Sequence, residues 1–337
     1  MRVGLVGAGL AGARRVTSLT HAGSTLSIVA DIDRDRAAGL ATPTGARVSQ
    51  SWEDVVHADD VDVVIVATPN KIARPVAVAA ALSGKHVLCE KPLGRNAAEA
   101  AEIVAAARRS GVTLKTGFNH RHHPAIARAH DLVVSGEIGE PLFIRCIYGH
   151  GGRPGYEREW RGNADLAGGG ELLDQGVHAV DLARWFLGEF TEVNGRVARW
   201  VWDIAPLEDN GFAWLETADR RLAMIHTSWT QWKNRFSFEV FGHDGFVRVE
   251  GLGGSYGVES LIHARRRSGG LPDEVTTEFP GPDESWHAEW IEFTAAIREG
   301  REPLGNGEDG LAALLLIDAL YRSAAEHVPV RLSEALA

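Results

Sequence analysis

The chain has 337 residues, 45% of them hydrophobic, and a formal net charge of −10. This length predicts two domains. The negative charge is concentrated after residue 118, which argues against nucleic acid as a partner, and no apolar span is long enough for a membrane helix.

A buried strand and a glycine-rich turn are the first predicted elements. Residues 2–6 read RVGLV and run into Gly7-x-Gly9-x-x-Gly12, followed by a helix from Ala13. In this context Gly7 permits a tight turn, Gly9 lets the backbone approach a pyrophosphate, and Gly12 lets helix and strand pack closely. The residues expected to bind a dinucleotide here are Gly7, Gly9, Leu10, Ala11 and Gly12.

The second predicted strand, residues 26–30, ends in Asp31, which follows Gly12 by 19 residues. A carboxylate at this spacing accepts hydrogen bonds from a ribose 2′-OH and repels a 2′-phosphate, which favours NAD. Arg34 and Arg36 follow closely and could soften that repulsion. NADP is therefore the alternative cofactor, with Arg34 among the cofactor contacts.

Three more strands are expected to end at the same edge of a parallel sheet. They span residues 61–67, 86–89 and 113–118. Ligands of open α/β sheets bind at the carboxyl ends of the strands. The residues expected to face the cofactor at these ends are Thr68, Pro69, Asn70, Glu90, Lys91 and Asn119.

Lys91, in the tripeptide Glu90-Lys91-Pro92, carries the predicted chemistry at this edge. A lysine there can hydrogen-bond a substrate oxygen while hydride leaves the same carbon. The alternative is a solvated lysine in an ordinary turn between strand and helix.

The predicted secondary structure changes near residue 119, where strands with alternating apolar and polar residues replace the repeated strand–helix units. They are expected at 143–148, 192–202, 212–217, 222–230, 236–242 and 245–250. The fold prediction is a Rossmann α/β domain over 1–118 and an α+β domain over 119–337. The second domain would hold a large, mostly antiparallel, open-faced sheet that binds substrate and mediates oligomerisation.

Two polar segments of the second domain are candidates for binding. The run His120-Arg121-His122-His123 invites a metal interpretation, but the fixed ligand set that zinc needs is missing, so no metal is predicted. The segment more plausibly borders cofactor and substrate. The loop at 151–161 is glycine-rich, aromatic and basic, and either binds a sugar or is an ordinary surface loop. The substrate contacts expected from these segments are Arg121, Arg153, Tyr156, Trp160 and Arg161.

A helix is predicted through residues 173–187, with Gly188 as its end. Asp174 and His178 are four residues apart and would share one face of it. A carboxylate and an imidazole so placed can act as a base and the group that orients it. The alternatives are a surface ion pair and a core histidine satisfied by its neighbour.

Together these motifs resemble the Gfo/Idh/MocA oxidoreductase family over essentially the whole chain. The resemblance rests on the glycine fingerprint, Thr68-Pro69-Asn70, Glu90-Lys91-Pro92, the Gly-Phe-Asn segment at 117–119, and Asp174 with His178. It implies that Lys91, Asp174 and His178 are catalytic, all three contacting substrate. It also implies a homodimer or homotetramer formed through the open sheet face. One departure is Ala73, where the family often carries a histidine.

The resulting hypothesis is an NAD(P)-dependent dehydrogenase acting on a secondary hydroxyl of a sugar, glycoside, nucleotide sugar or cyclitol. NAD-dependent glycoside hydrolysis and a non-catalytic dinucleotide- or sugar-sensing regulator are the alternatives. The chain begins directly with a strand, which leaves no room for a signal peptide, and Cys89 and Cys146 need not pair. A cytoplasmic location is therefore expected. The arginines favour an anionic substrate, whereas the acidic second domain favours a neutral one.

Overall fold

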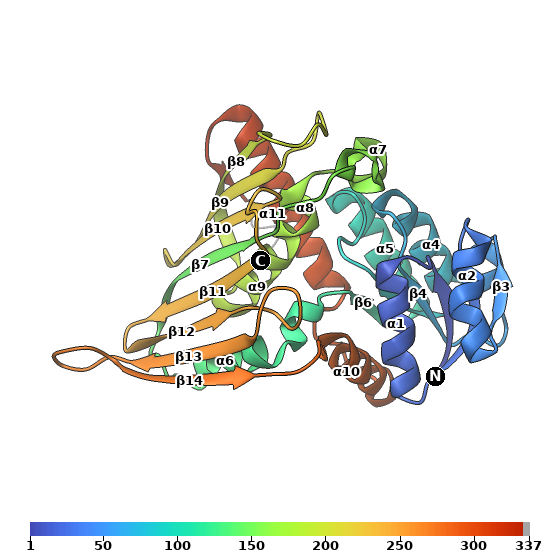
Figure 1. Cartoon of the computed structure of the whole chain (residues 1–337), viewed down its shortest axis with the longest axis horizontal. Helices are drawn as coiled ribbons and strands as arrows, with labels where there is room; N and C mark the ends of the chain where they lie inside the picture. The colour runs from blue at the N-terminus through green and yellow to red at the C-terminus, as the bar shows by residue number, and fades with distance from the viewer. Residues whose placement is uncertain (333–337) are drawn as a thin grey trace. The chain divides into compact units, whose positions relative to one another are not determined.

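The computed structural model describes residues 1–332, and the chain forms two compact units (Figure 1). The first unit consists of Met1–Asn119, Asp165–Gly168 and Trp286–Leu314. The second consists of His120–Ala164, Gly169–Ser285 and residues 315–332. Residues 286–314 join the first unit because Trp290 and Phe293 are buried in its core. The domain boundary between 118 and 119 stays a prediction.

The first unit is a doubly wound parallel sheet, in the strand order β3-β2-β1-β4-β5-β6. Its strands are β1 (Arg2–Val6), β2 (Thr25–Ala30), β3 (Arg47–Ser49), β4 (Val63–Val66), β5 (His86–Cys89) and β6 (Leu114–Thr116). Its helices are α1 (Leu10–His21), α2 (Arg34–Ala41), η1 (Thr42–Thr44), α3 (Glu53–Val56), α4 (Asn70–Leu82), α5 (Ala97–Ser110) and α10 (Ser285–Glu299).

The strand ends of this sheet form a single row. Ala30, Val6, Val66, Cys89 and Thr116 are successive partners across β2, β1, β4, β5 and β6. Because these strands are parallel and their last residues are in register, the segments that follow them leave the sheet along one edge. The predicted convergence of the strand ends is confirmed by this register.

The second unit contains a nine-stranded sheet in the order β14-β13-β12-β11-β7-β10-β9-β8-β15. All its pairings are antiparallel except that between β7 and β10. The strands are β7 (Pro141–Gly149), β8 (Phe190–Ala198), β9 (Asn210–Thr217), β10 (Leu222–Ser228), β11 (Arg235–Gly242), β12 (Gly245–Glu250), β13 (Glu259–Arg265), β14 (Asp273–Phe279) and β15 (Val330–Arg331). The predicted fold class, a Rossmann domain with a mostly antiparallel second sheet, is confirmed.

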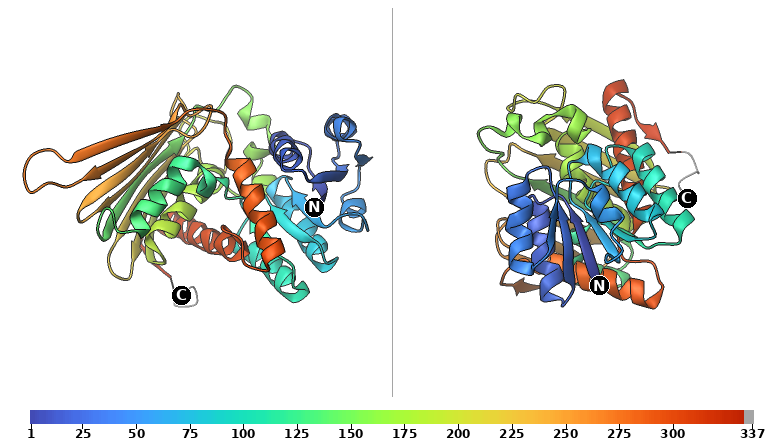
Figure 2. Two further views of the ribbon diagram at one scale, coloured as in Figure 1. Left: turned by 90° about the horizontal axis from the view of Figure 1, so that it is seen from below. Right: turned by 90° about the vertical axis from the view of Figure 1, so that its right-hand side faces the viewer.

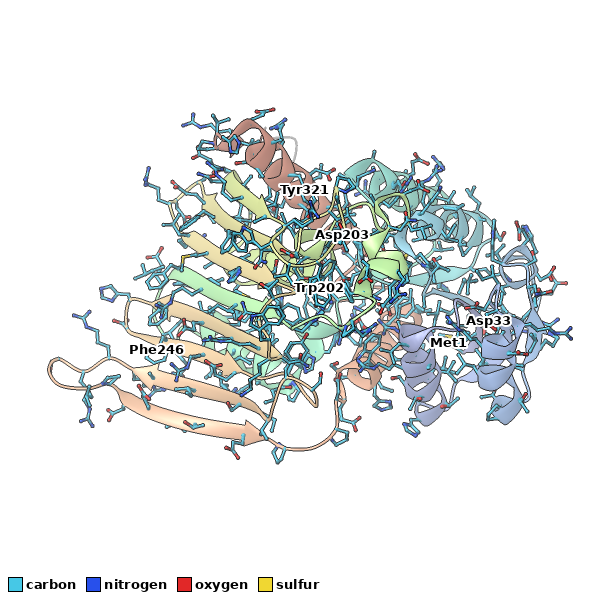
Figure 3. The ribbon with its side chains drawn as sticks, turned by 45° about the horizontal axis from the view of Figure 1, so that its top comes forward. Met1, Asp33, Trp202, Asp203, Phe246 and Tyr321 are labelled. Carbon is cyan, nitrogen blue, oxygen red and sulfur yellow. The ribbon has the colours of Figure 1, made fainter. Side chains whose placement is uncertain are left out.

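Helices cover one face of this second sheet (Figure 2). The elements outside the sheet are η2 (Asn119–His122), α6 (Pro124–Val134), η3 (Tyr156–Arg158), η4 (Trp160–Gly162), α8 (Glu171–Asp174), α9 (Gly176–Leu187) and α11 (Gly307–Glu326). Helix α7 (Ala164–Ala167) belongs to the first unit from Asp165 onwards, and α11 belongs to the second unit only from Leu315. Strand β7 shows the alternation that results: Ile144 and Cys146 are buried, whereas Phe143 and Arg145 are exposed. The sheet therefore has an open face. Figure 3 labels Phe246 on β12 and Trp202 in the loop that follows β8.

Three local predictions differ from the structure. The helix predicted through 173–187 is divided by a turn at Gln175 into α8 and α9, next to Gly176, a residue that weakens helices. Strand β8 ends at Ala198 because the carboxylate of Asp209 accepts the backbone N–H groups of residues 200–202. The β13–β14 hairpin was not predicted, because β14 is exposed along nearly its whole length and lacks apolar alternation.

Two further observations concern the described part of the chain. No helix there is long and apolar enough to cross a membrane. Cys89 and Cys146 are both buried and not disulfide-bonded.

Candidate functional site

The turn after β1 is built by three glycines that serve different purposes. Gly7 has a φ of +100°, and a Cβ there would lie 2.3 Å from the Ala67 carbonyl oxygen. A Cβ on Gly12 would lie 2.1 Å from the Gly7 carbonyl oxygen, whereas a Cβ on Gly9 would meet nothing within 4 Å. Thus Gly7 and Gly12 let the chain pack on itself, and Gly9 leaves its outer side open for a ligand.

Helix α1 begins directly at this turn, with Leu10 as its first residue. Its N-cap, Gly9, has no side chain to accept a hydrogen bond from the first turn. The N–H groups at the start of such a helix attract phosphate, and the helix dipole adds partial positive charge. Leu10 and Ala11, both predicted contacts, lie in this first turn.

Asp31 is tied to the same turn through backbone hydrogen bonds. Its Oδ2 accepts the N–H of Ala8 at 2.6 Å, and its Oδ1 accepts that of Asp33 at 2.8 Å. The carboxylate thus shapes the glycine turn in addition to any contact with a ribose. Arg34 is exposed, and Arg36 forms an ion pair with Asp33 at 3.1 Å.

The segment after β4 enters α4 through Thr68, Pro69 and Asn70. Pro69 is the N-cap residue of α4, and the side-chain amide of Asn70 donates to the carbonyl of Ala167 at 2.7 Å. The hydroxyl oxygen of Thr68 is buried and has no hydrogen-bond partner among the described residues.

Glu90 and Lys91 follow β5 in the same row of strand ends. Lys91 is half-buried, and its bond to Pro92 is cis. Glu90 turns its carboxylate to α1, where Oε1 accepts a hydrogen bond from Arg15 Nε at 2.6 Å. A Cβ on Gly117 would lie 2.9 Å from the other Glu90 oxygen, so a glycine is needed beside this pair.

The Arg15–Glu90 pair belongs to a larger cluster of four buried charges. Arg15 Nη1 donates to Glu289 Oε2 at 2.5 Å, and Lys115 Nζ lies 3.3 Å from Glu289 Oε1. Burial opposes the charged form of Arg15, but Glu289 and Glu90 overcome this effect and raise its pKa. The cluster ties the segment before Lys91 to α1 and to α10.

These features fit a dinucleotide. The open side of Gly9, the helix start at Leu10, Asp31 and the Thr68 hydroxyl all lie at the ends of β1, β2 and β4. When bound, the nicotinamide would supply the hydride acceptor or donor. Asn119, the last predicted contact, is buried after β6 at the start of η2.

In the second unit, Asp174 ends α8 and His178 lies in the first turn of α9. Both are buried. Arg161 from η4 donates through Nε to Asp174 Oδ2 at 3.0 Å, and its guanidinium lies over the Trp160 ring at 4.4 Å. Burial opposes the charge of Arg161, but Asp174 and other acidic neighbours raise its pKa.

The other loop arginines also contact carboxylates. Arg153 binds Glu159 through two hydrogen bonds of 2.7 Å each, and Arg158 lies 3.5 Å from Glu157. Tyr156 is buried with its ring edge-to-face against Trp229 at 4.7 Å. Burial raises the pKa of the Tyr156 hydroxyl, which therefore stays protonated. The loop at 151–161 is thus an ordered aromatic segment whose charges are neutralised locally.

Arg121, a predicted substrate contact, is paired with a carboxylate of α9. It forms two hydrogen bonds with Asp181 of α9, at 2.9 and 2.5 Å, and both residues are buried. Its guanidinium also lies 5.3 Å from the centre of the Trp185 ring. These contacts attach η2 to the helix that carries His178.

Glu208 is a supporting residue that the sequence analysis missed. Its carboxylate accepts the backbone N–H groups of Gly170 and Leu172 and the hydroxyl of Tyr321. Burial raises its pKa, although these hydrogen bonds oppose that shift. Glu208 thereby fixes the start of α8, and with it Asp174. No local pattern marks it, because its partners lie far away in the sequence.

Two family models match the chain. Residues 1–118 match an oxidoreductase family with an NAD-binding Rossmann fold, and residues 126–248 match the GFO/IDH/MocA C-terminal domain. The chain belongs to the GFO/IDH/MocA oxidoreductase family. The predicted family, enzyme class and NAD cofactor are therefore confirmed.

Named members of the GFO/IDH/MocA family align over much of the chain. Levoglucosan dehydrogenase from Pseudarthrobacter phenanthrenivorans is 32% identical over 225 residues, which are 63% of this chain and 57% of that relative. Inositol 2-dehydrogenase from Rubrobacter xylanophilus is 28% identical over 97% of this chain and 92% of its own. A solved levoglucosan dehydrogenase complex with NADH and levoglucosan has a TM-score of 0.90 at 25% identity, covering 99% of both chains.

Proposed function

We propose that this protein is a dehydrogenase that transfers hydride between a ring hydroxyl of a neutral cyclic polyol and NAD. Support comes from the family, whose named relatives above act on a sugar derivative and on inositol. The observation that carries the proposal is the row of strand ends. It puts Lys91 after β5, on the same sheet edge as the glycine turn after β1 and Thr68 after β4.

The proposed chemistry divides the work between three side chains. In the oxidation direction, His178 takes the proton of the substrate hydroxyl as the C–H hydride leaves, which turns the alcohol into a ketone. Asp174 orients the imidazole and stabilises its charged form. Lys91 stabilises the negative charge that develops on the oxygen. In the reduction direction the same groups act in reverse.

The charge balance of the loop favours a neutral substrate. Arg153, Arg158 and Arg161 each have a carboxylate partner within or next to their own segment. An anionic substrate would have to displace such a partner, whereas the hydroxyls of a polyol need only accept or donate single hydrogen bonds. Trp160 is only partly buried and its ring is suited to the apolar face of a sugar, whereas Tyr156 is buried against Trp229 and supports the loop from beneath. Within the loop, a pyranose or cyclitol is therefore the best-matched substrate.

The test is incubation with NAD and a panel of neutral and anionic sugars, cyclitols and aryl glycosides, following both NADH and released aglycone. Accumulation of NADH with neutral members supports the proposal. Release of aglycone without net NADH would identify a glycoside hydrolase instead, and binding of ligands without either product would identify a sensor. Turnover confined to anionic sugars would overturn the neutral-substrate assignment.

We also propose that two copies associate through the open face of the large sheet. That face carries exposed apolar side chains that include Phe143, Trp214 and Met224, and Phe143 stacks on Phe241 at 4.8 Å. Trp214→Glu should yield a smaller particle in light scattering, whereas Trp200→Glu, outside the strands, should not. An unchanged particle size in Trp214→Glu would contradict this interface.

We propose a cytoplasmic location as well, which the two buried free cysteines support.

A further inference from the structure

The ring of His178 is stacked on a second histidine. The imidazoles of His120 and His178 are nearly parallel, with centroids 3.7 Å apart and an interplanar angle of 18°. Both side chains are buried. His120 comes from η2 and His178 from α9, so this contact joins two elements far apart in the sequence. A ring held face to face in a buried site cannot tilt without losing that contact.

His120 is itself fixed from other sides. Its Nε2 and the hydroxyl of Tyr148, on β7, are hydrogen-bonded at 3.1 Å. The ring of Phe236, on β11, meets the edge of His120 at 6.1 Å and that of Tyr148 at 5.3 Å. Burial raises the pKa of Tyr148 well above its ordinary value, so the hydroxyl keeps its proton and remains a hydrogen-bonding group.

The neighbouring elements hold this arrangement in place. His123, whose ring lies 5.6 Å from that of His120, is hydrogen-bonded to Glu259 of β13 at 2.8 Å. Glu259 also accepts the backbone N–H of Ala125 at 2.6 Å, at the start of α6. The segment that carries His120 is therefore anchored to the large sheet. The reaction proposed above assigns His120 no role.

We propose that His120 is a positioning residue for the reaction: its ring, held by Tyr148, fixes the plane of the His178 imidazole so that the base points at the substrate hydroxyl. This inference rests on the proposed function, in which His178 accepts the proton. Proton transfer requires the base within hydrogen-bond reach and in line with the hydroxyl. A shift of about 1 Å in a reacting group can lower the rate by roughly a hundredfold.

The first test compares two replacements of His120 by steady-state kinetics. His120→Ala removes the ring and should lower kcat by about tenfold or more while KM for NAD is kept. His120→Phe restores a flat ring and should recover kcat to within about threefold of the wild type. Equal loss in both variants, or no loss in His120→Ala, would overturn the proposal.

A matched control separates positioning from general destabilisation. His130 stacks on Trp185 at the same centroid distance, 3.7 Å, within the same unit but away from the His178 ring. His130→Ala should lower the unfolding midpoint and leave kcat unchanged. If His130→Ala lowered kcat as much as His120→Ala, loss of a stacked ring would be acting through stability, and the proposal would be wrong.

Tyr148 supplies a second test through a double-mutant cycle. Tyr148→Phe should lower kcat by a few-fold in the wild type, because it releases His120 Nε2. It should have no effect in the His120→Phe background, where that nitrogen is absent. An equal effect on kcat in both backgrounds would contradict the proposal that Tyr148 acts through His120. His178→Ala is measured alongside: full turnover there would defeat the proton-accepting role proposed for His178, whereas an inactive His178→Ala with a normal His120→Ala would defeat this inference alone.

Discussion

The two units hold their candidate functional residues in different ways, the first on a cofactor side and the second on a substrate side. The cofactor side is made from the ends of parallel strands, and its buried charges, Arg15, Glu90, Glu289 and Lys115, contact one another across three regular elements. The substrate side is made from short helices and a loop, where Arg161 and Asp174 meet near the surface. The comparison teaches that side-chain ion pairs occur on both sides, but on the cofactor side they join residues already carried by a regular sheet and its helices, whereas on the substrate side they hold short segments in place.

The largest expected effect on turnover comes from removing Lys91 or His178. Lys91, on the cofactor side, is assigned to the substrate oxygen, and His178, on the substrate side, is assigned to its proton. Lys91→Ala and His178→Ala should each lower kcat by roughly a hundredfold or more, because general acid–base groups contribute about that much. NAD affinity, measured by fluorescence titration, should be kept. Lys233→Ala and His243→Ala, both exposed, are the controls. Near-normal turnover in both the Lys91 and the His178 variant would contradict the proposed mechanism.

The second prediction tests the buried charges of the cofactor side. Glu289→Gln leaves Arg15 and Lys115 without one of their carboxylates, so the free energy of unfolding in urea should fall by about 3–5 kcal/mol. Glu299→Gln in the same helix breaks only the exposed pair with Arg301 and should lower it by less than about 1 kcal/mol. Similar losses in the two variants would show that the buried cluster contributes no more than a surface pair.

The third prediction concerns cofactor choice at Asp31. Asp31→Asn replaces one acceptor oxygen by a donor, so one backbone N–H, of Ala8 or Asp33, loses its partner. Catalytic efficiency with NAD should fall by about 10- to 100-fold, since hydrogen bonds to charged groups contribute about 1.5–3 kcal/mol. The NADP/NAD ratio should rise. Asp60→Asn, which breaks an exposed pair with Arg47, is the control, and an unchanged ratio in Asp31→Asn would exclude a role in discrimination.

The smallest expected effects separate two arginines of the substrate side. Arg161→Ala should lower kcat about tenfold for neutral and charged sugars alike, because it acts through Asp174. Arg153→Ala removes an exposed pair with Glu159 and a contact with the Tyr156 ring at 5.5 Å, and it should change KM by less than about threefold for either class. If KM increased for charged sugars alone in either variant, the hypothesis of an anionic substrate would be favoured again.

The cofactor side could be predicted from the sequence because its signals are local. Gly7 is required by the neighbouring strand and Gly12 by the backbone of the turn itself, and Asp31 follows at a spacing set by the strand–helix–strand unit. The fold class followed from the same periodicities. The family and its cofactor followed from motifs of this kind.

What could not be predicted depends on distant partners. Arg15 and Glu289 are 274 residues apart, and neither pattern nor spacing links them. Strand β14 exists because it pairs with β13, not because its own residues alternate. The break at Gln175, next to Gly176, separates Asp174 from His178 although the apolar periodicity continues through it. The roles of the predicted site residues stay predictions until the variants are measured.

The local charge balance of the loop at 151–161 makes this loop suitable for replacement by protein engineering. Because Arg153 pairs with Glu159 and Arg158 with Glu157, the loop could be exchanged for another without leaving an unpaired charge in the scaffold. Arg161 is the exception, since its partner Asp174 lies outside the loop. A transplanted loop that keeps this one arginine would allow new substrates to be explored while the carboxylate beside it stays neutralised.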